Sequence, residues 1–350
     1  MNSSVNIPRL LALKGAVPAY LLDQSDVGTR AGLQFQSNRD INRLLPVFMN
    51  AGIDRRYSCV PIEWYGEDHG WKDRTALFLE HAQDLLEKVA RAAIAEAKLT
   101  VDDIDAIVAV STTGIATPSL DALLIERLGL RRDIARLPIF GLGCAGGVVG
   151  LARAADVARA RPGAKVLFLV VELCALTFRK NDYSKSNIVA TALFGDGAAG
   201  AIISTDGKGP ALEASGEHTW PASLDVMGWD VEEDGLKARF AQSIPALVSA
   251  DFRRILDDYL AENDFKLRDF GAFACHPGGA KVLDALEVAL DLEPGALADS
   301  RDILREYGNM SAVTALFVLE RILARRSRER ILMTTLGPGF SAAMLAVDAR

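Results

Sequence analysis

The sequence is poor in cysteine, and its four cysteines form no CxxC pair. A zinc site or a disulfide framework is therefore not expected, and we predict no bound metal. Thiols without a pairing pattern suit a reducing compartment, which favours a cytoplasmic protein.

The sequence also lacks an excess of basic residues and long hydrophobic runs. Its 39 Lys and Arg residues stand against 46 Asp and Glu, and the net charge of −7 argues against a general nucleic-acid-binding protein. A small local basic patch for a phosphorylated ligand is still compatible with this charge. The apolar run near the N-terminus is interrupted by Lys14, and other runs, such as 166–171, have the length of a strand. Neither a signal peptide nor a membrane span is predicted.

The chain of 350 residues exceeds the size, roughly 250–300 residues, at which one hydrophobic core stops growing, so two core units are expected. Hydrophobic periodicity and turn residues predict the same order of elements twice. The first series is helix 73–97, strand 104–110, a helix with Thr117 as N-cap and Pro118 as N1 that stops near Gly129, a helix from Cys144 to about 160, and strands 164–171 and 198–204. The second series is helix 245–261, strand 270–275, helices 280–290 and 310–325, and strands 330–335 and 340–347.

This repetition indicates a duplicated α/β unit, with one half at 1–207 and the other at 208–350. Helices that alternate with buried strands favour mostly parallel sheets with helices on both faces. No Pro/Ser-rich linker separates the halves, so one compact unit is expected.

Active sites in such sheets usually lie at strand ends and at the helix N-termini beside them, and three residues occupy such positions. Cys144 and Asn309 each open the equivalent helix of their half, and His276 ends strand 270–275. If the halves pack about a pseudo-twofold axis, these positions converge on one site.

Each of the three residues has a chemical use and a structural alternative. A helix N-terminus lowers the pKa of a thiol, which makes Cys144 a candidate nucleophile; the alternative is a small buried core residue. His276 can deprotonate that thiol and then donate a hydrogen bond to a carbonyl oxygen, or it can simply cap a turn. Asn309 can stabilise an oxyanion without a change of charge, or it can serve as a helix N-cap. Papain-like proteases use the same residue types, but this mid-chain Cys lacks their local signature.

Eight segments together resemble the type III polyketide synthases, the chalcone synthase family, and the likeness covers nearly the whole chain. In order they are STTGIATPSLD (111–121), GLGCAGG (141–147), ELCALTF (172–178), LFGDGAA (193–199), MGWDVEEDGL (227–236), HPGGAKVLD (276–284), YGNMSA (307–312) and GPGF (337–340). The resemblance implies a thiolase-like fold with duplicated halves in a layered αβαβα arrangement. Its N-terminal half carries the nucleophilic Cys, and its C-terminal half carries the His and the Asn.

The family's chemistry implies the role of each catalytic residue. Cys144 takes the starter acyl group from CoA. His276 and Asn309 hold the thioester carbonyl of malonyl-CoA, so that loss of CO2 yields a stabilised enolate. The enolate then attacks the acyl-Cys144 thioester. No metal or redox cofactor is implied, because the two hydrogen-bond donors act on charge that forms only during the reaction.

The resemblance also implies a substrate cavity. Phe194 matches the family's gatekeeper phenylalanine, whereas Ala238 stands where plant enzymes carry a second one and would open the cavity toward a long acyl chain. Cys174 stands where plant enzymes have a cavity threonine, and ELCALTF looks like bacterial members that make alkylpyrones or alkylresorcinols from fatty acyl-CoA. The remaining matches to cavity positions are Thr112, Thr113, Thr177, Ser311, Gly337 and Gly339.

Further matches concern the partners. Thr117 matches a residue that reaches into the neighbouring subunit's cavity, which implies a homodimer. The phosphates of the acyl-CoA and malonyl-CoA substrates should meet cationic side chains near the tunnel mouth. Arg43, Arg55 and Arg56 lie in the matching region, and the alternative for each of them is a solvated surface charge.

Two other functions remain open at this point. A ketoacyl-acyl-carrier-protein synthase that initiates fatty-acid synthesis shares the fold and the three catalytic residue types, but the Pro-Gly-Gly that follows His276 favours the polyketide family. A non-catalytic thiolase-fold protein that binds acyl-CoA would not need Cys144, His276 and Asn309 together.

Overall fold

A nine-stranded sheet forms the centre of the computed structural model, which describes residues 6–36, 41–241, 243–325 and 328–350. The strand order is β11-β12-β13-β8-β1-β7-β6-β4-β5. The first half of the chain provides β1 (Arg9–Ala16), β4 (Ala106–Ser111), β5 (Ala135–Phe140), β6 (Val166–Leu173) and β7 (Asp196–Ser204). The second half provides β8 (Ala211–Thr219), β11 (Ala272–Cys275), β12 (Arg330–Gly337) and β13 (Ser341–Asp348). The two halves of the sheet meet where Arg9 pairs with Ala211.

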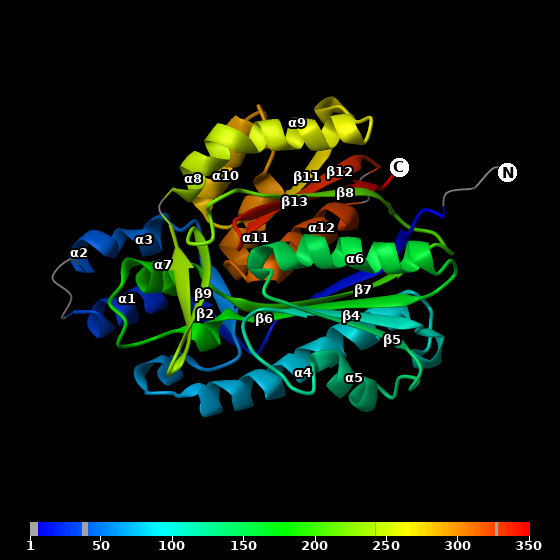
Figure 1. Cartoon of the computed structure of the whole chain (residues 1–350). Helices are drawn as coiled ribbons and strands as arrows, with labels where there is room; N and C mark the ends of the chain where they lie inside the picture. Colours follow the sequence, from blue (N-terminus) through cyan, green and yellow to red (C-terminus); the bar gives the residue numbers. More distant parts are fainter. Residues whose placement is uncertain (1–5, 37–40, 242, 326–327) are drawn as a thin grey trace.

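Helices lie outside both halves of the sheet and also between them, which gives five layers (Figure 1). One outer layer holds α4 (Trp71–Glu96) and α5 (Leu120–Leu128). The middle layer holds α6 (Gly146–Ala160) and α12 (Thr314–Ala324), with α11 (Ala298–Tyr307) beside α12. The other outer layer holds α8 (Ile244–Leu247), α9 (Arg253–Glu262) and α10 (Ala280–Ala289). The predicted αβαβα arrangement is confirmed.

Strand β6 shows why the central strands are apolar at most positions, with Glu172 as its one charged residue. Val166, Phe168 and Val170 pack into the core around α6 and α12. The alternate residues Leu167, Leu169 and Val171 pack instead against α4 and α5. Since successive side chains of a strand point to opposite faces, a strand covered on both faces is mainly apolar on both.

The sheet is mixed, which corrects the expectation of mostly parallel pairing. The parallel pairs are β4–β5, β4–β6 and β11–β12. The antiparallel pairs are β1–β7, β6–β7, β12–β13 and β13–β8, together with the single contact of β1 with β8. Residues 338–340 join β12 to β13 directly, and a connection this short can only join antiparallel strands.

Two predicted helices also differ in detail. Helix α5 begins at Leu120 with Ser119 as its N-cap, so Thr117 and Pro118 lie in the exposed turn before it rather than inside the helix. It ends at Gly129 as predicted. The helix expected over 245–261 is divided by a π-helical turn, Val248–Phe252, between α8 and α9.

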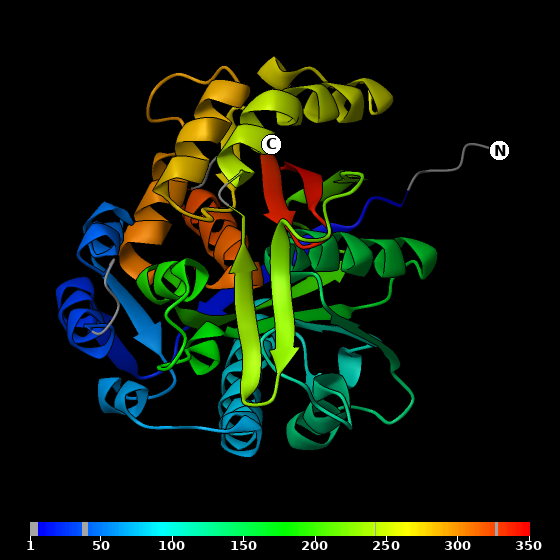
Figure 2. The same ribbon diagram turned by 60° about the vertical axis from the view of Figure 1, so that its left-hand side comes forward.

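Smaller elements gather at one end of the layers. They are α1 (Gln24–Gln34), α2 (Ile41–Leu44), α3 (Pro46–Asn50), α7 (Lys185–Leu193) and the short ribbon of β2 (Tyr20–Asp23) and β3 (Arg55–Ser58). A separate hairpin, β9 (Met227–Glu232) and β10 (Gly235–Phe240), stands across this end of the molecule (Figure 2). In the described residues, no helix has both the length and the hydropathy needed to cross a membrane.

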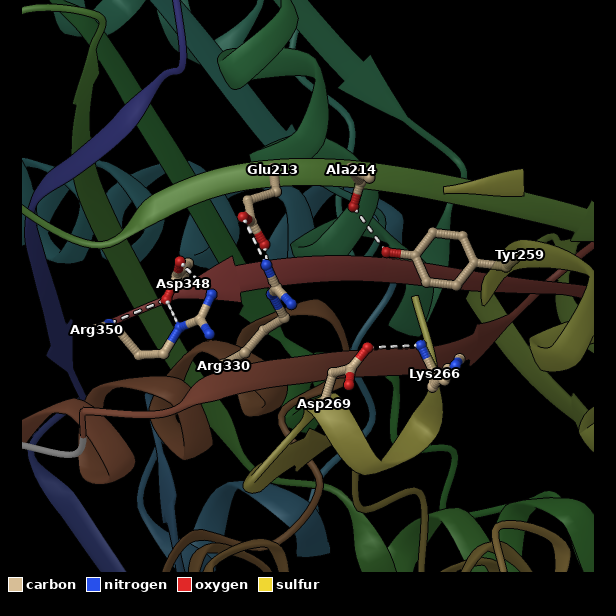
Figure 3. Close-up of polar contacts among 8 residues, drawn as sticks. All are labelled: Glu213, Ala214, Tyr259, Lys266, Asp269, Arg330, Asp348 and Arg350. Carbon is tan, nitrogen blue, oxygen red and sulfur yellow. Dashed lines mark hydrogen bonds and ion pairs between the residues drawn. The ribbon is translucent and has the colours of Figure 1, made fainter. Parts of the chain in front are cut away.

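Polar contacts tie the outer helices and the last strands of the second half together (Figure 3). Arg330, at the start of β12, donates to both carboxylate oxygens of Glu213 on β8, at 2.7 and 3.1 Å. Its guanidinium also lies over the ring of Phe265, 4.6 Å from the centroid. The Tyr259 hydroxyl on α9 donates to the carbonyl of Ala214 at 2.9 Å. The Tyr259 bond therefore ties α9 to β8, and the Arg330–Glu213 pair ties β12 to β8.

Candidate active site

The turn that carries Cys144 is fixed from two sides. Cys144 lies in a 3-10 turn, Gly143–Ala145, that leads directly into α6. The amide of Gly143 donates to the Thr112 hydroxyl at 2.9 Å, and the Thr335 hydroxyl donates to the carbonyl of Cys144 at 2.8 Å. Thr112 follows the end of β4 and Thr335 belongs to β12, so both halves of the sheet position this turn.

The glycines of the two facing turns allow them to touch. A Cβ atom on Gly143 would lie 2.6 Å from the ring of Pro338, and one on Gly337 would lie 2.7 Å from the carbonyl oxygen of Leu142. Real Cβ atoms do not approach other atoms so closely. The turn at 337–340 therefore forms a wall behind the Cys144 turn. Gly337 and Gly339 do not themselves line a cavity, but Leu336 next to them does.

One cavity of about 370 Å³ is lined by Cys144, His276 and Asn309 together. His276 follows β11, its amide donates to the carbonyl of Thr334 at 2.8 Å, and its side chain is buried. Neither of its ring nitrogens has a hydrogen-bond partner within the described residues. The three residues predicted from separate stretches of sequence thus meet at one site.

Asn309 is held by its own turn. Its backbone amide donates to the carbonyl of Leu193 at 2.8 Å, and its side-chain oxygen accepts from the amide of Ser311 at 2.8 Å. The side-chain amide donates to the carbonyl of Gly278 at 3.3 Å, a long bond that leaves donor capacity for a ligand.

The equivalence between Cys144 and Asn309 is only approximate. Cys144 lies inside the 3-10 turn that precedes α6. Asn309 lies before the corresponding turn, Ser311–Val313, and so stands further ahead of α12. The expectation that each residue opens its helix is therefore corrected for Asn309. The residues between Asn309 and α12 let its side chain reach the cavity.

Burial dominates the protonation of the two candidate groups. It raises the pKa of the Cys144 thiol to about 12, opposed by a hydrogen bond with Ser311 and reinforced by Glu172. It also lowers the pKa of His276 to about 4. In the free protein, desolvation therefore dominates the protonation of the thiol, and its pKa lies above the ordinary value despite the position before α6. At neutral pH the free protein therefore has a protonated thiol and an uncharged imidazole in the same cavity.

Glu172 is a buried carboxyl group that sequence reasoning missed. It lies on β6, and one oxygen accepts from the amides of Thr112 and Thr113, at 3.1 and 3.0 Å. Its other oxygen has no hydrogen-bond partner within the described residues. Burial raises its pKa to about 7, although these hydrogen bonds oppose the shift. A single acidic residue inside an apolar strand was the available signal.

Phe194 forms the centre of an aromatic cluster beside the catalytic cavity. Its ring centroid lies 5.7 Å from those of Trp229 and Phe240, which belong to the hairpin β9–β10. Cys174 and Ala238 pack in the same cluster. The amide of Gly195 donates to the carbonyl of Asn309 at 3.0 Å, so the segment of Phe194 is tied to the turn that carries Asn309.

A second cavity, of about 480 Å³, lies on the side of Phe194 that faces α1. Three of the predicted cavity residues line it, namely Cys174, Thr177 and Phe194. The rest of its wall is mainly apolar and includes Leu22, Val27 and Phe178. Burial and then the nearby Glu172, Asp196 and Cys144 raise the pKa of the Cys174 thiol. Phe240 packs against the cluster of Cys174 and also lines the cavity of Cys144, so the two cavities are neighbours.

The remaining predicted wall residues line neither cavity. The hydroxyls of Thr112 and Thr113 accept from the amides of Gly143 and Leu173, both at 2.9 Å, so they fix the backbone. Thr117 is exposed, two residues before Ser119, whose hydroxyl accepts from Arg136 on β5. Ser311 is buried and bonds with the Cys144 thiol.

The three arginines predicted to bind CoA are placed differently. Arg43 and Arg55 are exposed and do not line the catalytic cavity. Arg56 is buried and donates to the carbonyls of Thr191, Ala192 and Phe194, at distances of 2.7 to 3.0 Å. Burial lowers its pKa to about 10. Its guanidinium therefore binds backbone carbonyls of the segment 191–194 in the protein interior, which disfavours a role in binding a phosphate.

Comparison with known proteins agrees with this geometry. The family model for chalcone and stilbene synthases matches residues 63–207 with its N-terminal domain and residues 211–345 with its C-terminal domain. The chain belongs to the chalcone and stilbene synthase family, the type III polyketide synthases. It is 36% identical to a 1,3,6,8-tetrahydroxynaphthalene synthase of Streptomyces peucetius, over 95% of this chain and 90% of that protein.

Two further relatives widen the comparison. An alpha-pyrone synthesis polyketide synthase-like protein of Mycobacterium tuberculosis is 26% identical over 96% of this chain and 90% of its own length. The crystal structure of the 1,3,6,8-tetrahydroxynaphthalene synthase from Streptomyces coelicolor A3(2) superposes with a TM-score of 0.93 at 30% identity, covering 97% of this chain and 99% of the other. The chain is therefore an enzyme, an acyltransferase of the condensing type, with the thiolase-like fold of its family.

Proposed function

We propose that this enzyme condenses malonyl-CoA units onto an acyl-CoA starter that it holds as a thioester of Cys144. The observation that carries the proposal is the shared cavity of Cys144, His276 and Asn309, in which both ring nitrogens of His276 lack a partner among the described residues. His276 takes the thiol proton as Cys144 attacks the acyl-CoA carbonyl, and CoA leaves with a proton as its free thiol.

The second step uses His276 and Asn309 as hydrogen-bond donors. Malonyl-CoA loses CO2, and the electron pair of the broken bond becomes an enolate. His276 and Asn309 donate hydrogen bonds to its oxygen, which stabilises charge that appears only during the reaction. The enolate carbon attacks the acyl carbonyl on Cys144 and releases the thiolate, to which the longer chain returns. Phe194 and its aromatic neighbours keep water from the reacting groups.

We further propose a fatty acyl starter and an alkylpyrone or alkylresorcinol type of product. The second cavity supports this proposal, because its wall is mainly apolar and because its residues Cys174 and Phe194 pack with Phe240, which lines the cavity of Cys144. Ala238 packs against Cys174 and Phe194, where a larger side chain would crowd the same region. The alpha-pyrone synthesis relative supports the pyrone product class.

A homodimer is proposed from the exposed edge strand. Strand β5 ends the sheet and is largely exposed, with Phe140 at 61% and Leu137 at 37% of its full accessible surface. Ile115 is exposed at 47%, and Thr117 is close to it in sequence and also exposed. A second copy would cover this apolar edge, which otherwise favours aggregation. Because Phe140 leads directly into the Cys144 turn, the contact would also steady the nucleophile.

Two smaller proposals complete this account. Arg43 and Arg55 stay candidates for contacts with the outer part of CoA. A cytoplasmic location is proposed, on the basis of four cysteines that form no disulfide.

The test is product formation by the purified protein. It is incubated with malonyl-CoA and a series of acyl-CoA starters from short to long, and the products are identified by mass spectrometry. We expect malonyl-derived pyrones or resorcinols, made fastest from fatty starters. Complete absence of malonyl-derived products with every starter would contradict the condensation itself.

The starter class is tested by filling the second cavity. Cys174→Phe should shift the preference toward shorter starters, whereas Cys174→Ser should keep that of the parent. An unchanged preference for long starters in Cys174→Phe would show that the acyl chain lies elsewhere.

A further inference from the structure

Two lysines stand at the solvent end of the catalytic cavity. Lys185 and Lys281 line the same cavity as Cys144, His276 and Asn309, and both are exposed. Among the described residues that line this cavity, they are the two lysines, and no Arg, Asp or Glu accompanies them. The mouth of the cavity is therefore locally positive in a chain whose net charge is −7.

The helices that carry these lysines increase the positive potential. Lys185 is the first residue of α7, after its N-cap Ser184, and Lys281 is the second residue of α10. A helix N-terminus carries partial positive charge, so a lysine there is unfavourable for the helix itself. Neither first turn contains an acidic residue. No hydrogen bond or ion pair is found for either ammonium group within the described part of the chain.

The buried end of the cavity indicates what these charges face. The unpartnered nitrogens of His276 and the Cys144 thiol lie at the inner end, where the proposed function places a thioester. A CoA thioester that reaches them must leave its phosphates at the outer end. By contrast, the Arg56 guanidinium is turned inward onto carbonyl oxygens, and neither Arg43 nor Arg55 lines this cavity.

We propose that Lys185 and Lys281 bind the phosphates of CoA at the mouth of the catalytic cavity. The proposal rests on the proposed function and names the residues that recognise the carrier part of its substrate. Lysine acts on a phosphate as a mobile point charge, and here two helix N-termini add their field to it. The two lysines fix the outer end of the substrate, so that the pantetheine arm runs inward to Cys144.

The test compares substrates with and without phosphates. The variants are Lys185→Gln, Lys281→Gln and the double variant, with Lys72→Gln as matched control. Lys72 is exposed and is the second residue of α4, the same helix position as Lys281. It lines neither the catalytic cavity nor the second cavity. Each protein is assayed with one acyl group carried either by CoA or by N-acetylcysteamine, which has the reactive end of CoA but no phosphate.

We expect each single variant to raise KM for the CoA ester by about three- to tenfold, and the double variant to raise it by more, with kcat nearly unchanged. KM for the N-acetylcysteamine ester should stay at the parental value, and Lys72→Gln should match the parent with both. Added salt should weaken CoA binding to the parent more than to the double variant. Equal changes for both esters, or no change for either, would overturn the proposal.

Binding of CoA itself separates this proposal from the proposed function. Calorimetry with free CoA should give a dissociation constant that rises in the double variant and not in Lys72→Gln. If the parent binds CoA in this lysine-dependent way but makes no malonyl-derived product, only the proposed function fails. If CoA binds equally well to the parent and the double variant, the assignment of the lysines is wrong.

Discussion

Replacement of Glu172 by Gln should change how the stability of the protein depends on pH. The Glu172 side chain is fully buried, and burial raises its pKa from 4.5 to about 7. One pKa unit corresponds to about 1.4 kcal/mol, so the ionised group costs the folded state about 3 kcal/mol. Gln keeps an oxygen that can accept from the amides of Thr112 and Thr113, and it carries no charge at any pH.

The direction of the effect follows from the raised pKa. A group whose pKa is higher in the folded state stabilises that state when it is protonated. This contribution is complete below about pH 4.5 and is lost as the pH rises through about 7. Between pH 5 and pH 8 the parent should therefore lose about 2.5 kcal/mol of unfolding free energy relative to Glu172→Gln. The variant can start less stable at pH 5, because its new amide hydrogens need partners.

Urea unfolding at several pH values, at one protein concentration, measures this difference. Glu262→Gln is the matched control, since Glu262 is exposed at the end of α9 and its replacement should leave the pH dependence parallel to that of the parent. Parallel curves for the parent and Glu172→Gln from pH 5 to pH 8, or a parent that gains stability over that range, would refute the reasoning.

Three other predictions concern packing and assembly. Phe168→Ala removes a fully buried ring from the core around α6 and should cost about 3–5 kcal/mol of unfolding free energy by urea titration, with a clearly smaller loss for Phe168→Leu. Gly337→Ala places a methyl group against the carbonyl of Leu142 and should lower kcat at least tenfold by displacing the Cys144 turn, which product assays can measure; parental turnover would show that the two turns are not tightly packed. Phe140→Asp puts a charge on the exposed edge of β5 and should give monomers by light scattering, and an unaffected dimer would place the interface elsewhere.

The parts of the fold that sequence predicted best are those with strong local patterns. The apolar stripe of α4 and the apolar run 166–171 of β6 were predicted because burial on one face or on both faces sets the spacing of apolar residues. Strand β5 was missed because it is an exposed edge strand with charged and proline residues among its apolar ones. The antiparallel pairing of β13 depends on chain direction after a turn, which helix–strand alternation does not reveal.

The site was predictable at the level of residue identity and less so at the level of environment. Glycines and strand ends pointed to Cys144, His276 and Asn309, and these residues do share one cavity. Their catalytic roles and the division of the chain at 207 stay predictions. The inward turn of Arg56 and the raised pKa of the Cys144 thiol depend on burial by segments remote in sequence, which no local pattern encodes.

The central claim is that Cys144 carries the acyl chain during the reaction. Intact-protein mass spectrometry after brief incubation with an acyl-CoA, without malonyl-CoA, tests it most directly. The parent and Cys59→Ala should both gain the mass of one acyl group, because Cys59 is buried and lines neither cavity, and Cys144→Ala should gain none. An acyl adduct of the same yield on Cys144→Ala would contradict the account.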